Sequence, residues 1–308
     1  MKEFDLIALL TKGLPANDSV VVGAGDDCAV LDLGIPDQLV LFKTDAVVEG
    51  VHFTGETPPR LIGRKALARA LSDVAAMAGK PVAALVTLAL PQDFSAEWVT
   101  HIYEGLNACA AQFGVAIAGG ETTTNLERIL ISISLLGTVG RGKQVLRSGA
   151  KAGDAIFVTG ELGGSLAGRH LDFEPRLAEG RWLADHFKIH AMMDVSDGVA
   201  GDLRHILQAS QVGAELLKSA VPISRAAKLR AKRNPKPPLI AALTDGEDFE
   251  LLFTVASGSA VKLFDAWKQQ FPKLRLSCIG KIVPGRDIIL RDRYGAQKLE
   301  AYGYDHFA

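Results

Sequence analysis

The chain has 308 residues, of which 48% are hydrophobic and 22% are charged, so it is long enough for two globular domains with separate cores. Its 34 Lys and Arg residues nearly balance its 35 Asp and Glu residues, and the formal net charge is -1. This balance provides no overall attraction to nucleic acid or to an anionic membrane, so it excludes strongly basic binding proteins and favours small-molecule partners.

The cysteines and the N-terminus indicate a compartment. Cys28, Cys109 and Cys278 are far apart and form neither a CxxC pair nor a metal-finger spacing, which fits a reducing environment. The stretch from Met1 to Lys12 lacks the basic start and apolar core of a secretory signal. Apolar runs elsewhere are too short to span a membrane. We therefore expect a soluble, cytoplasmic protein.

The first half of the chain mixes helical and extended patterns. A broad apolar face predicts a helix over Lys2 to Thr11. Apolar spacings of three and four predict two more helices, over Leu61 to Met77 and Ala96 to Phe113. Runs rich in β-branched residues predict strands at Val20–Val22, Ala29–Leu31, Leu39–Phe42, Val82–Leu90 and Ile129–Val139.

A polar, glycine-containing stretch from Arg141 to Asp154 separates this half from a second series of elements, and we expect domains at 1–140 and 150–308. The basic segment from Arg225 to Pro238 has no aromatic residue for base stacking and is predicted to be an exposed loop or helix end. Mixed helix and strand in both halves predicts an α+β fold. The elements expected in the second half are strands at Ala155–Thr159, Met192–Val195, Phe249–Val255 and Leu276–Ile279, and helices over Gly198 to about Ser210 and Lys262–Gln270.

Acidic residues gather at predicted strand ends and loop tips, mostly beside glycine or hydroxyl residues. Glycine lets a backbone approach a ligand closely, and carboxylates with nearby hydroxyls are hard oxygen ligands suited to Mg²⁺. The seven segments are Gly25-Asp26-Asp27, Lys43-Thr44-Asp45, Leu71-Ser72-Asp73, Gly119-Gly120-Glu121, Asp194-Val195-Ser196-Asp197-Gly198, Asp245-Gly246-Glu247-Asp248 and Tyr304-Asp305-His306.

Each segment also has a purely structural interpretation. The Gly25-Asp26-Asp27 segment can be a simple turn, and Asp197 can cap the helix that follows it. Asp73 lies in a mostly small and apolar surround, so its carboxylate needs either a bound cation or a salt bridge to Arg69.

Familiar nucleotide-binding and catalytic motifs are absent from the sequence. There is no GxxxxGK[ST] loop, no HRD or DFG set, no Ser nucleophile elbow and no HExxH. The loop from Gly160 to Ser165 resembles a phosphate cradle, but the motif is weak and a plain strand-to-helix turn is the favoured interpretation. A bound nucleotide therefore requires another scaffold.

The segments taken together resemble the thiamine-monophosphate kinase family. They follow that family's order from residue 25 to the last residue: GDDCAV (25–30), TDAVVEGVHF (44–53), ALSDVAAMAG (70–79), AGGETTT (118–124), LRSGAKAGD (146–154), MDVSDG (193–198), DGEDFEL (245–251) and GYDHFA (303–308). The resemblance implies the two-domain α+β fold of the aminoimidazole-ribonucleotide synthetase superfamily and a homodimer formed through the N-terminal domain.

The same resemblance implies an activity and assigns residues to it. The activity is ATP- and Mg²⁺-dependent phosphorylation of thiamine monophosphate to thiamine diphosphate, the last step in making that cofactor. Several Mg²⁺ ions correspond to Asp27, Thr44, Asp45, Asp73, Glu121, Asp194 and Asp197. ATP contacts correspond to Gly120, Arg147 and Ser196, and contacts to thiamine monophosphate correspond to His52, Glu247 and Tyr304.

Four features depart from the family pattern. Glu121 replaces an Asp, Lys43 replaces a small hydroxyl residue, and Asp245 stands where a second glycine is more usual. The stretch between Gly168 and Pro175 is also short. These departures leave the metal contacts near Lys43 and Glu121 open.

The chemistry fits the lack of an obvious general base. A phosphate monoester has a second pKa of about 6 and is mostly dianionic at neutral pH, so it is already a nucleophile. The obstacle is repulsion, about 4 kcal/mol for two unit charges 4 Å apart at an effective dielectric constant of 20. Cations held by carboxylates offset it. The alternatives are a selenophosphate synthetase or purine-pathway synthetase, a non-catalytic Mg-nucleotide sensor, and a Mg²⁺-dependent phosphatase.

Overall fold

The computed structural model describes residues 3–232, 236–300 and 303–304, which form two compact units. The N-terminal unit comprises Asn17–Gln144 and His170–Arg181. The C-terminal unit comprises residues 3–16, Val145–Arg169 and, as far as they are described, residues 182–304. The units are therefore not simple halves of the chain, because the N-terminal unit is made of two segments and the C-terminal unit of three.

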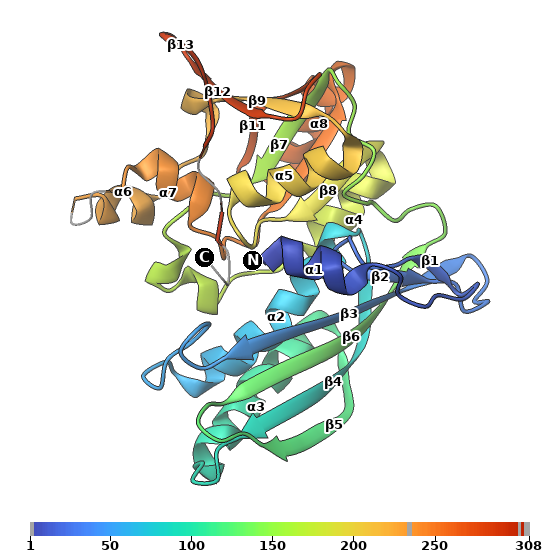
Figure 1. The fold of residues 1–308 in the computed structure, drawn as a ribbon, viewed down its shortest axis with the longest axis vertical. Helices are drawn as coiled ribbons and strands as arrows, with labels where there is room; N and C mark the ends of the chain where they lie inside the picture. The colour runs from blue at the N-terminus through green and yellow to red at the C-terminus, as the bar shows by residue number, and fades with distance from the viewer. Residues whose placement is uncertain (1–2, 233–235, 301–302, 305–308) are drawn as a thin grey trace. The chain divides into compact units, whose positions relative to one another are not determined.

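The N-terminal unit is built on a six-stranded sheet in the order β1-β2-β3-β6-β4-β5 (Figure 1). Its long central strands alternate buried and less buried residues, as expected for a sheet with one covered face. Only β4 and β5 run parallel, and the other neighbours are antiparallel. The strands are β1 (Val20–Val22), β2 (Ala29–Leu31), β3 (Gln38–Val48), β4 (Lys80–Leu90), β5 (Ala116–Thr124) and β6 (Leu130–Gly140).

Two helices, α2 (Pro59–Ala76) and α3 (Ala96–Phe113), cover one face of this sheet (Figure 1). The helix α3 begins where the Ser95 hydroxyl accepts the Trp98 N–H, and it ends at Gly114 in a left-handed conformation. The two helices touch through glycines, because a Cβ on Gly63 would lie 1.9 Å from the Ile102 carbonyl oxygen. Close packing of α2 fixes the orientation of the charged residues on its sheet-facing side.

The C-terminal unit has a seven-stranded sheet in the order β13-β12-β9-β11-β7-β10-β8. The central strand β7 is buried at every position, which fits the apolar run Ala155–Val158 between its polar end residues. The sheet is mainly antiparallel, with β12 parallel to β9. Its strands are β7 (Asp154–Thr159), β8 (Ile189–Asp194), β9 (Gly213–Leu217), β10 (Leu251–Ala256), β11 (Leu276–Val283), β12 (Ile288–Asp292) and β13 (Gly295–Lys298).

Helices pack beside this sheet and carry the apolar core. The helix α5 contributes Val199, Leu203 and Ile206 to a cluster that includes Ile156 and Leu252. Phe157 and Phe253, which alternate with those strand residues, stack on each other with ring centroids 5.5 Å apart. The helices of this unit are α1 (Glu3–Thr11), α4 (Leu177–His186, which starts in the N-terminal unit), α5 (Val199–Ser210), α6 (Arg225–Arg230), α7 (Pro238–Thr244) and α8 (Ser257–Gln270), with short 3-10 turns at Ser165–Ala167, Arg169–Leu171 and Lys218–Ala220.

The structure confirms the expected α+β fold and the major elements. The helix expected at Ala96–Phe113 matches α3 at both ends, and the one expected from Lys2 is described from Glu3. The basic segment from Arg225 begins with a short helix, α6. Over the described part of the chain, none of the helices combines the length and the apolar character that crossing a membrane requires.

Candidate functional site

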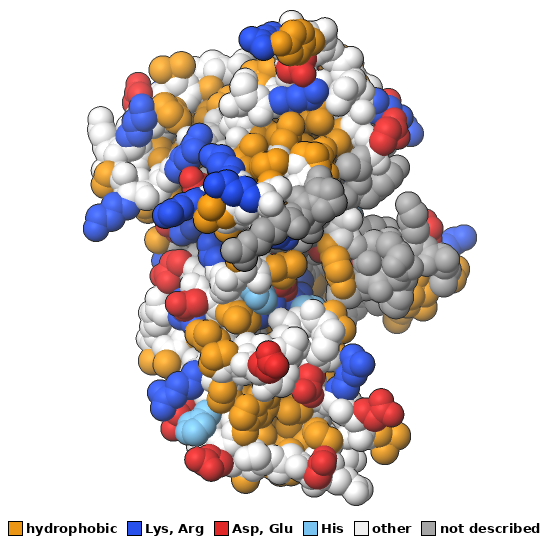
Figure 2. Space-filling view, turned by 90° about the vertical axis from the view of Figure 1, so that its left-hand side faces the viewer, with side chains coloured by type: hydrophobic (Ala, Val, Ile, Leu, Met, Phe, Trp, Pro, Cys, Tyr) orange, Lys and Arg blue, Asp and Glu red, His pale blue; other side chains and the backbone are white. Residues whose placement is uncertain are grey.

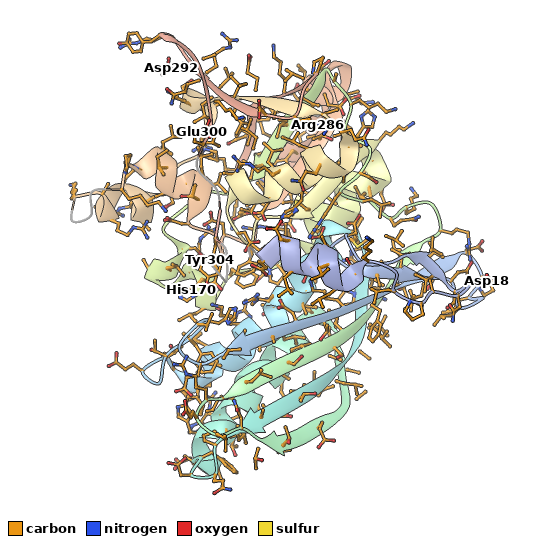
Figure 3. The ribbon with its side chains drawn as sticks, viewed as in Figure 1. Asp18, His170, Arg286, Asp292, Glu300 and Tyr304 are labelled. Carbon is orange, nitrogen blue, oxygen red and sulfur yellow. The ribbon has the colours of Figure 1, made fainter. Side chains whose placement is uncertain are left out.

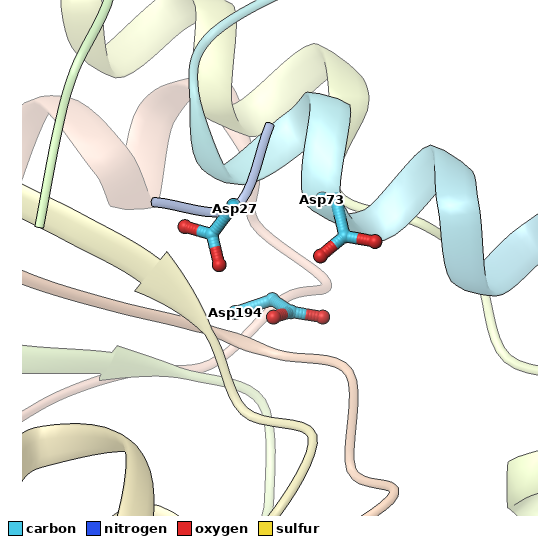
Figure 4. A group of neighbouring side chains, drawn as sticks. All are labelled: Asp27, Asp73 and Asp194. Atoms are coloured by element: carbon cyan, nitrogen blue, oxygen red, sulfur yellow. The ribbon is translucent and has the colours of Figure 1, made fainter. Parts of the chain in front are cut away.

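Two buried carboxylates form the centre of the acidic site in the N-terminal unit. Asp27 lies in the turn between β1 and β2, and Asp73 lies on α2. Each offers a carboxylate oxygen within 4.8 Å of the other, and the residues are only 1% and 8% exposed. Figure 4 shows the two side chains approaching from these different elements. Because like charges at this spacing repel strongly out of water, the pair requires nearby cations.

Two basic side chains supply part of that positive charge. The Lys43 ammonium lies 3.0 Å from Oδ1 of Asp73. Arg69 donates from Nε and NH2 to the two oxygens of Asp45, at 3.1 and 3.2 Å. Burial alone would lower the pKa of Lys43, but Asp73 and Asp45 outweigh it and raise that pKa, so the ammonium is charged. Lys43 is thus an ion-pair partner of Asp73, whereas Arg69, which was considered as that partner from the sequence, pairs with Asp45.

Cys28 follows Asp27 and is buried. Its N–H donates to the Met77 sulfur at 3.0 Å. Burial and the neighbouring Asp73 raise the pKa of the thiol well above its ordinary value, so the neutral thiol predominates at neutral pH. Cys28 is accordingly a packed residue and not an activated nucleophile.

The strand register divides the predicted ligands between the two faces of the sheet. Asp45 pairs with Ile133 on β6, whereas Thr44 pairs with Ser134. Since paired residues point to the same side and neighbours alternate, Asp45 faces α2 and Thr44 faces the open side.

Glu121 shares the open face with Thr44. It pairs with Thr87 on β4, which pairs in turn with Ser132 on β6. Glu121 is exposed on the edge strand β5. The preceding Gly120 is pressed against β4, where a Cβ would lie 1.8 Å from the Val86 carbonyl oxygen. The structure therefore separates Thr44 and Glu121 from the Asp27 and Asp73 pair by the thickness of the sheet.

In the C-terminal unit the remaining acidic ligands lie where β8 ends. Asp194 is the last residue of β8, pairs with Leu251 on β10 and is 3% exposed (Figure 4). Ser196 and Asp197 follow in a partly buried loop, and Gly198 begins α5. The helix-cap interpretation of Asp197 is not borne out, because Gly198 occupies the N-cap position and no side chain caps α5.

Asp202 supports this loop and was not identified from the sequence. Its carboxylate accepts the Asp197 N–H at 3.2 Å, and it is completely buried. Burial raises the pKa of Asp202, the charges of Asp197 and Asp194 raise it further, and Arg147 opposes them. Arg147 also adds to the burial that lowers the pKa of His205 to about 4, so His205 is neutral at neutral pH. Arg147, expected to contact ATP, therefore lies close to the start of α5.

The segment from Asp245 to Phe249 has an unusual backbone. Glu247 and Phe249 both have left-handed φ values, 52° and 51°, although neither is glycine. Their N–H groups donate to the Ser196 and Val195 carbonyl oxygens at 2.6 and 2.7 Å. This segment therefore lies directly beside the loop that carries Ser196 and Asp197.

The glycine loop that resembled a phosphate cradle is a turn bound to carboxylates. The Gly163 N–H donates to Asp248 at 2.7 Å, and the Gly164 N–H donates to Asp245 at 3.1 Å. These donors are already used, which supports the plain strand-to-helix turn. Asp245, which stands where the family more often has a glycine, is therefore a structural residue that anchors this loop.

Asp245 also explains part of the basic segment. Arg230 and Lys236 contact its carboxylate at 2.6 and 2.7 Å. The pKa of Asp245 is lowered because the hydrogen bonds from Lys236, Arg230 and Gly164 outweigh the raising effect of burial. Figure 2 shows Lys and Arg side chains gathered over the surface of α6 and α7.

The predicted substrate contacts lie at three described positions. His52 is partly buried, and its Nδ1 accepts the Val48 N–H at 3.1 Å. Tyr304 is 48% exposed, and its N–H donates to the Asp197 carbonyl oxygen at 2.9 Å (Figure 3). The remainder of the C-terminal GYDHFA segment, residues 305–308, lies outside the described residues.

Two domain families and several known enzymes match this chain. Residues 25–139 match the family "AIR synthase related protein, N-terminal domain", and residues 151–293 match the corresponding C-terminal domain family. A thiamine-monophosphate kinase of Rhodopirellula baltica is 43% identical over 280 residues, which cover 89% of this chain and 86% of that protein. The enzyme of Bacillus subtilis is 36% identical over the full length of both chains, 100% of each.

A solved structure agrees with these relatives. The structure described as "AaThiL complexed with AMPPCP and TMP" superimposes with a TM-score of 0.84 at 31% identity, covering 99% of this chain and 97% of that chain. The domain families give the fold, and the relatives and this structure point to one enzyme class. The chain therefore belongs to the thiamine-monophosphate kinase family, with its two-domain AIR synthase-like fold, and is a thiamine-phosphate kinase.

Proposed function

We propose that this enzyme transfers the γ-phosphoryl group of ATP directly to the phosphate of thiamine monophosphate, in a Mg²⁺-dependent, in-line reaction. The observation that carries the proposal is the buried Asp27 and Asp73 pair, whose oxygens lie within 4.8 Å of each other. AMPPCP is an analogue of ATP, and its presence with TMP in the related AaThiL structure supports the same pair of substrates here.

The donor chemistry fits magnesium. Carboxylate and hydroxyl oxygens are its preferred protein ligands, and none of the proposed ligands offers nitrogen or sulfur. We assign Asp27, Asp45 and Asp73 of the N-terminal unit and Asp194 and Asp197 of the C-terminal unit to this role, with Thr44 and Glu121 as ligands on the open face of β3 and β5. Bound Mg²⁺ supplies the positive charge that offsets repulsion between donor and acceptor phosphates.

The chain's own residues hold and orient the reacting groups. Gly120, Arg147 and Ser196 are proposed to contact ATP, while His52, Glu247 and Tyr304 contact thiamine monophosphate. The Tyr304 ring offers an aromatic surface for the cationic heterocycle of thiamine. No side chain needs to remove a proton, because the acceptor phosphate is already mostly dianionic.

A product assay tests the reaction. With ATP, Mg²⁺ and thiamine monophosphate, thiamine diphosphate and ADP should appear in equal amounts, and thiamine itself should be a very poor acceptor. Asp73→Asn should fold normally and lose turnover by more than about tenfold, since it removes charge with little change in volume. Comparable turnover of thiamine and thiamine monophosphate would contradict a phosphate acceptor.

The same assay separates the alternatives. A phosphatase would release inorganic phosphate without ATP, and a nucleotide sensor would bind ATP without forming ADP. The selenophosphate and purine-pathway synthetases are disfavoured by four relatives, 33% to 43% identical over 89% or more of this chain, that are thiamine-monophosphate kinases.

We also propose that the enzyme is a homodimer formed through the open face of the N-terminal sheet. Phe42, Leu85 and Leu136 lie on that face and are 45%, 50% and 42% exposed. Phe42 and Leu136 are direct cross-strand partners, so the apolar surface is continuous from β3 to β6. Patches of this kind mark interaction surfaces. A cytoplasmic location stays a prediction, supported by the three free cysteines.

A further inference from the structure

The chain passes from the C-terminal unit to the N-terminal unit between Arg169 and His170. Both residues lie in one short 3-10 turn, Arg169–Leu171, within the stretch that is shorter than the family pattern. Their side chains nevertheless enter two different hydrogen-bond networks, one in each unit. Each network ends at a residue proposed above to contact thiamine monophosphate.

Arg169 binds the segment that carries Glu247. Its NH2 group donates to Asp248 at 2.7 Å and to the Glu161 carbonyl oxygen at 2.9 Å, and its NH1 group donates to Glu250 at 3.0 Å. Both carboxylates are essentially buried, with 0% and 1% of their side chains exposed. A planar guanidinium with several fixed donors can satisfy all three acceptors at once, whereas an ammonium cannot.

This contact matters because the backbone beside it is strained. Left-handed φ values, as at Glu247 and Phe249, are unfavourable for a residue with a side chain. Such conformations persist only where surrounding contacts determine them. Asp248 lies between these two residues and is held by Arg169 and the Gly163 N–H. Arg169 is therefore one of the external anchors of the conformation that presents Glu247.

His170 supports the other substrate contact through Lys65. The Lys65 ammonium, on a completely buried residue, lies 2.8 Å from the His52 carbonyl oxygen and 2.8 Å from Nδ1 of His170. An ammonium group has no acceptor, so His170 accepts through Nδ1. Figure 3 labels His170. Because His170 holds the Lys65 ammonium in place, the ammonium in turn holds the backbone carbonyl of His52.

We propose that Arg169 and His170 are positioning residues for thiamine monophosphate, each bracing one substrate-contacting residue of its own unit. Arg169 acts on Glu247 through Asp248, and His170 acts on His52 through Lys65. Neither touches the reacting atoms. The inference rests on the proposed roles of Glu247 and His52, and it places the determinants of substrate affinity in the short stretch that departs from the family.

The Arg169 arm is tested with Arg169→Lys. We expect KM for thiamine monophosphate to rise about tenfold, the size expected from losing a charge-assisted hydrogen bond, while KM for ATP and kcat change by less than about twofold. Amide hydrogen exchange at Glu247 and Phe249 should accelerate, because their N–H groups are held only while the segment keeps its shape. Arg291→Lys, at a partly exposed ion pair with Glu215, is the matched control and should leave both measurements unchanged.

Asp248→Asn provides a second variant if Arg169→Lys does not fold. It keeps the acceptor for the Gly163 N–H and removes the charge that Arg169 meets. The same rise in KM is expected. Unchanged KM for thiamine monophosphate and unchanged exchange at Glu247 in the folded variant would overturn the Arg169 assignment.

The His170 arm uses removal and rescue. His170→Phe keeps a ring but removes the acceptor for Lys65, so KM for thiamine monophosphate should rise and amide exchange at His52 should accelerate. His170→Asn places an oxygen near the former Nδ1 and should restore most of the affinity. His186→Phe, at an exposed position in the last turn of α4, is the control. Equal behaviour of the Phe and Asn variants would contradict a role through Lys65.

Two reference variants keep this inference distinct from the proposed function. If the parent enzyme makes no thiamine diphosphate, the proposed function fails. If Glu247→Ala and His52→Ala leave KM for thiamine monophosphate unchanged, the assignment of the contacts fails. If these variants raise KM but Arg169→Lys and His170→Phe do not, only the positioning inference fails.

Discussion

Lys43 places a positive charge inside a site proposed to bind Mg²⁺, where the family pattern has a small hydroxyl residue. Its ammonium lies 3.0 Å from Asp73. A positive charge this close lowers the local affinity for a second cation. In return it offsets the Asp27 and Asp73 repulsion when no metal is bound.

We therefore predict that Lys43→Thr, which restores a hydroxyl side chain, lowers the Mg²⁺ concentration needed for half-maximal thermal stabilisation by severalfold. The metal-free protein should melt at a lower temperature than the parent, since Asp73 loses a cationic partner. Differential scanning fluorimetry without nucleotide measures both effects. Lys80→Thr, at an exposed position where β4 begins, is the control. A half-saturating Mg²⁺ concentration equal to that of the parent would contradict competition at Asp73.

Asp248 gives a prediction about pH. Burial raises its pKa from 3.8 to about 7, although Arg169 and the Gly163 N–H both act to lower it. A raised pKa means that the folded state holds the proton more tightly than the unfolded state. The resulting stability is complete below about pH 4 and is lost as the pH rises to about 7, by up to about 4 kcal/mol at 1.4 kcal/mol per unit.

Asp248→Asn removes this titration, so the free energy of unfolding of the parent minus that of the variant should fall between pH 4 and pH 7. Urea denaturation at several pH values measures it. Asp292→Asn should give the opposite slope, and only below about pH 4, because the hydrogen bond from Lys218 lowers the pKa of Asp292 from 3.8. A pH-independent difference for Asp248→Asn would show that the carboxylate is ionised throughout.

At the scale of elements, the sequence predicted what periodicity encodes. The helix α3 has a polar N-cap, a left-handed glycine at its end and an apolar face, and its limits were predicted correctly. The strand β5 was missed because it is an exposed edge strand of small and polar residues, AIAGGETTT, without an alternating pattern. It forms only because Gly120 can approach β4 closely.

The residues of the site divide in the same way, into those that motifs indicate and those that depend on the three-dimensional structure. The motifs correctly indicated Asp27 and Asp73 as near neighbours, but alternation along β3 puts Asp45 and Thr44 on opposite faces, which depends on register and not on motif. Arg169 and His170 were missed because their partners are distant in the chain. Asp202 accepts from the nearby Asp197 N–H, but it lies outside the motifs and was missed for that reason. The sequence contains one usable signal of this network. Lys65 is a lysine among the apolar residues of a helix expected to be buried, and a buried lysine needs partners.

The edge strand β5 carries the next prediction. Glu121 supplies the same charge as the usual Asp from one methylene farther out, and Mg²⁺ tolerates little deviation from octahedral geometry at about 2.1 Å. We predict that Glu121→Gln loses at least about tenfold in turnover, whereas Glu121→Asp keeps a substantial part of it with an altered Mg²⁺ requirement. Activity measured as a function of Mg²⁺ concentration separates the two.

The contrasting interpretation is that exposed Glu121 points to solvent and that the backbone at Gly120 alone contacts nucleotide. In that case Glu121→Gln matches the parent in turnover and in half-saturating Mg²⁺, and the set of metal ligands is smaller by one. Glu127→Gln, an exposed residue in the loop after β5, controls for a general loss of negative charge.

At the scale of the whole molecule, the residues proposed to bind each substrate are divided between the two units. The proposed ATP contacts include Gly120 of one unit and Arg147 of the other, and the proposed thiamine monophosphate contacts include His52 and Glu247. An isolated N-terminal unit would also lack residues 170–181 if it were cut at the domain boundary expected from the sequence. We therefore expect activity to require the complete chain.

The last prediction concerns the open face of the N-terminal sheet. Phe42, Leu85 and Leu136 expose apolar surface on adjacent strands, and a homodimer through this face would bury it. Leu136→Glu places a charge at the centre of the patch, where burial without a partner costs several kcal/mol, so the dimer should dissociate into folded monomers. Sedimentation velocity measures the mass, expected to fall from twice the chain mass to 32.8 kDa. The control is Leu126→Glu, whose parent residue is 94% exposed in the loop between β5 and β6 and should not affect assembly. If Leu136→Glu sediments as the parent does, the dimer uses another surface, and if the parent itself sediments as a monomer, the proposal of a homodimer is wrong.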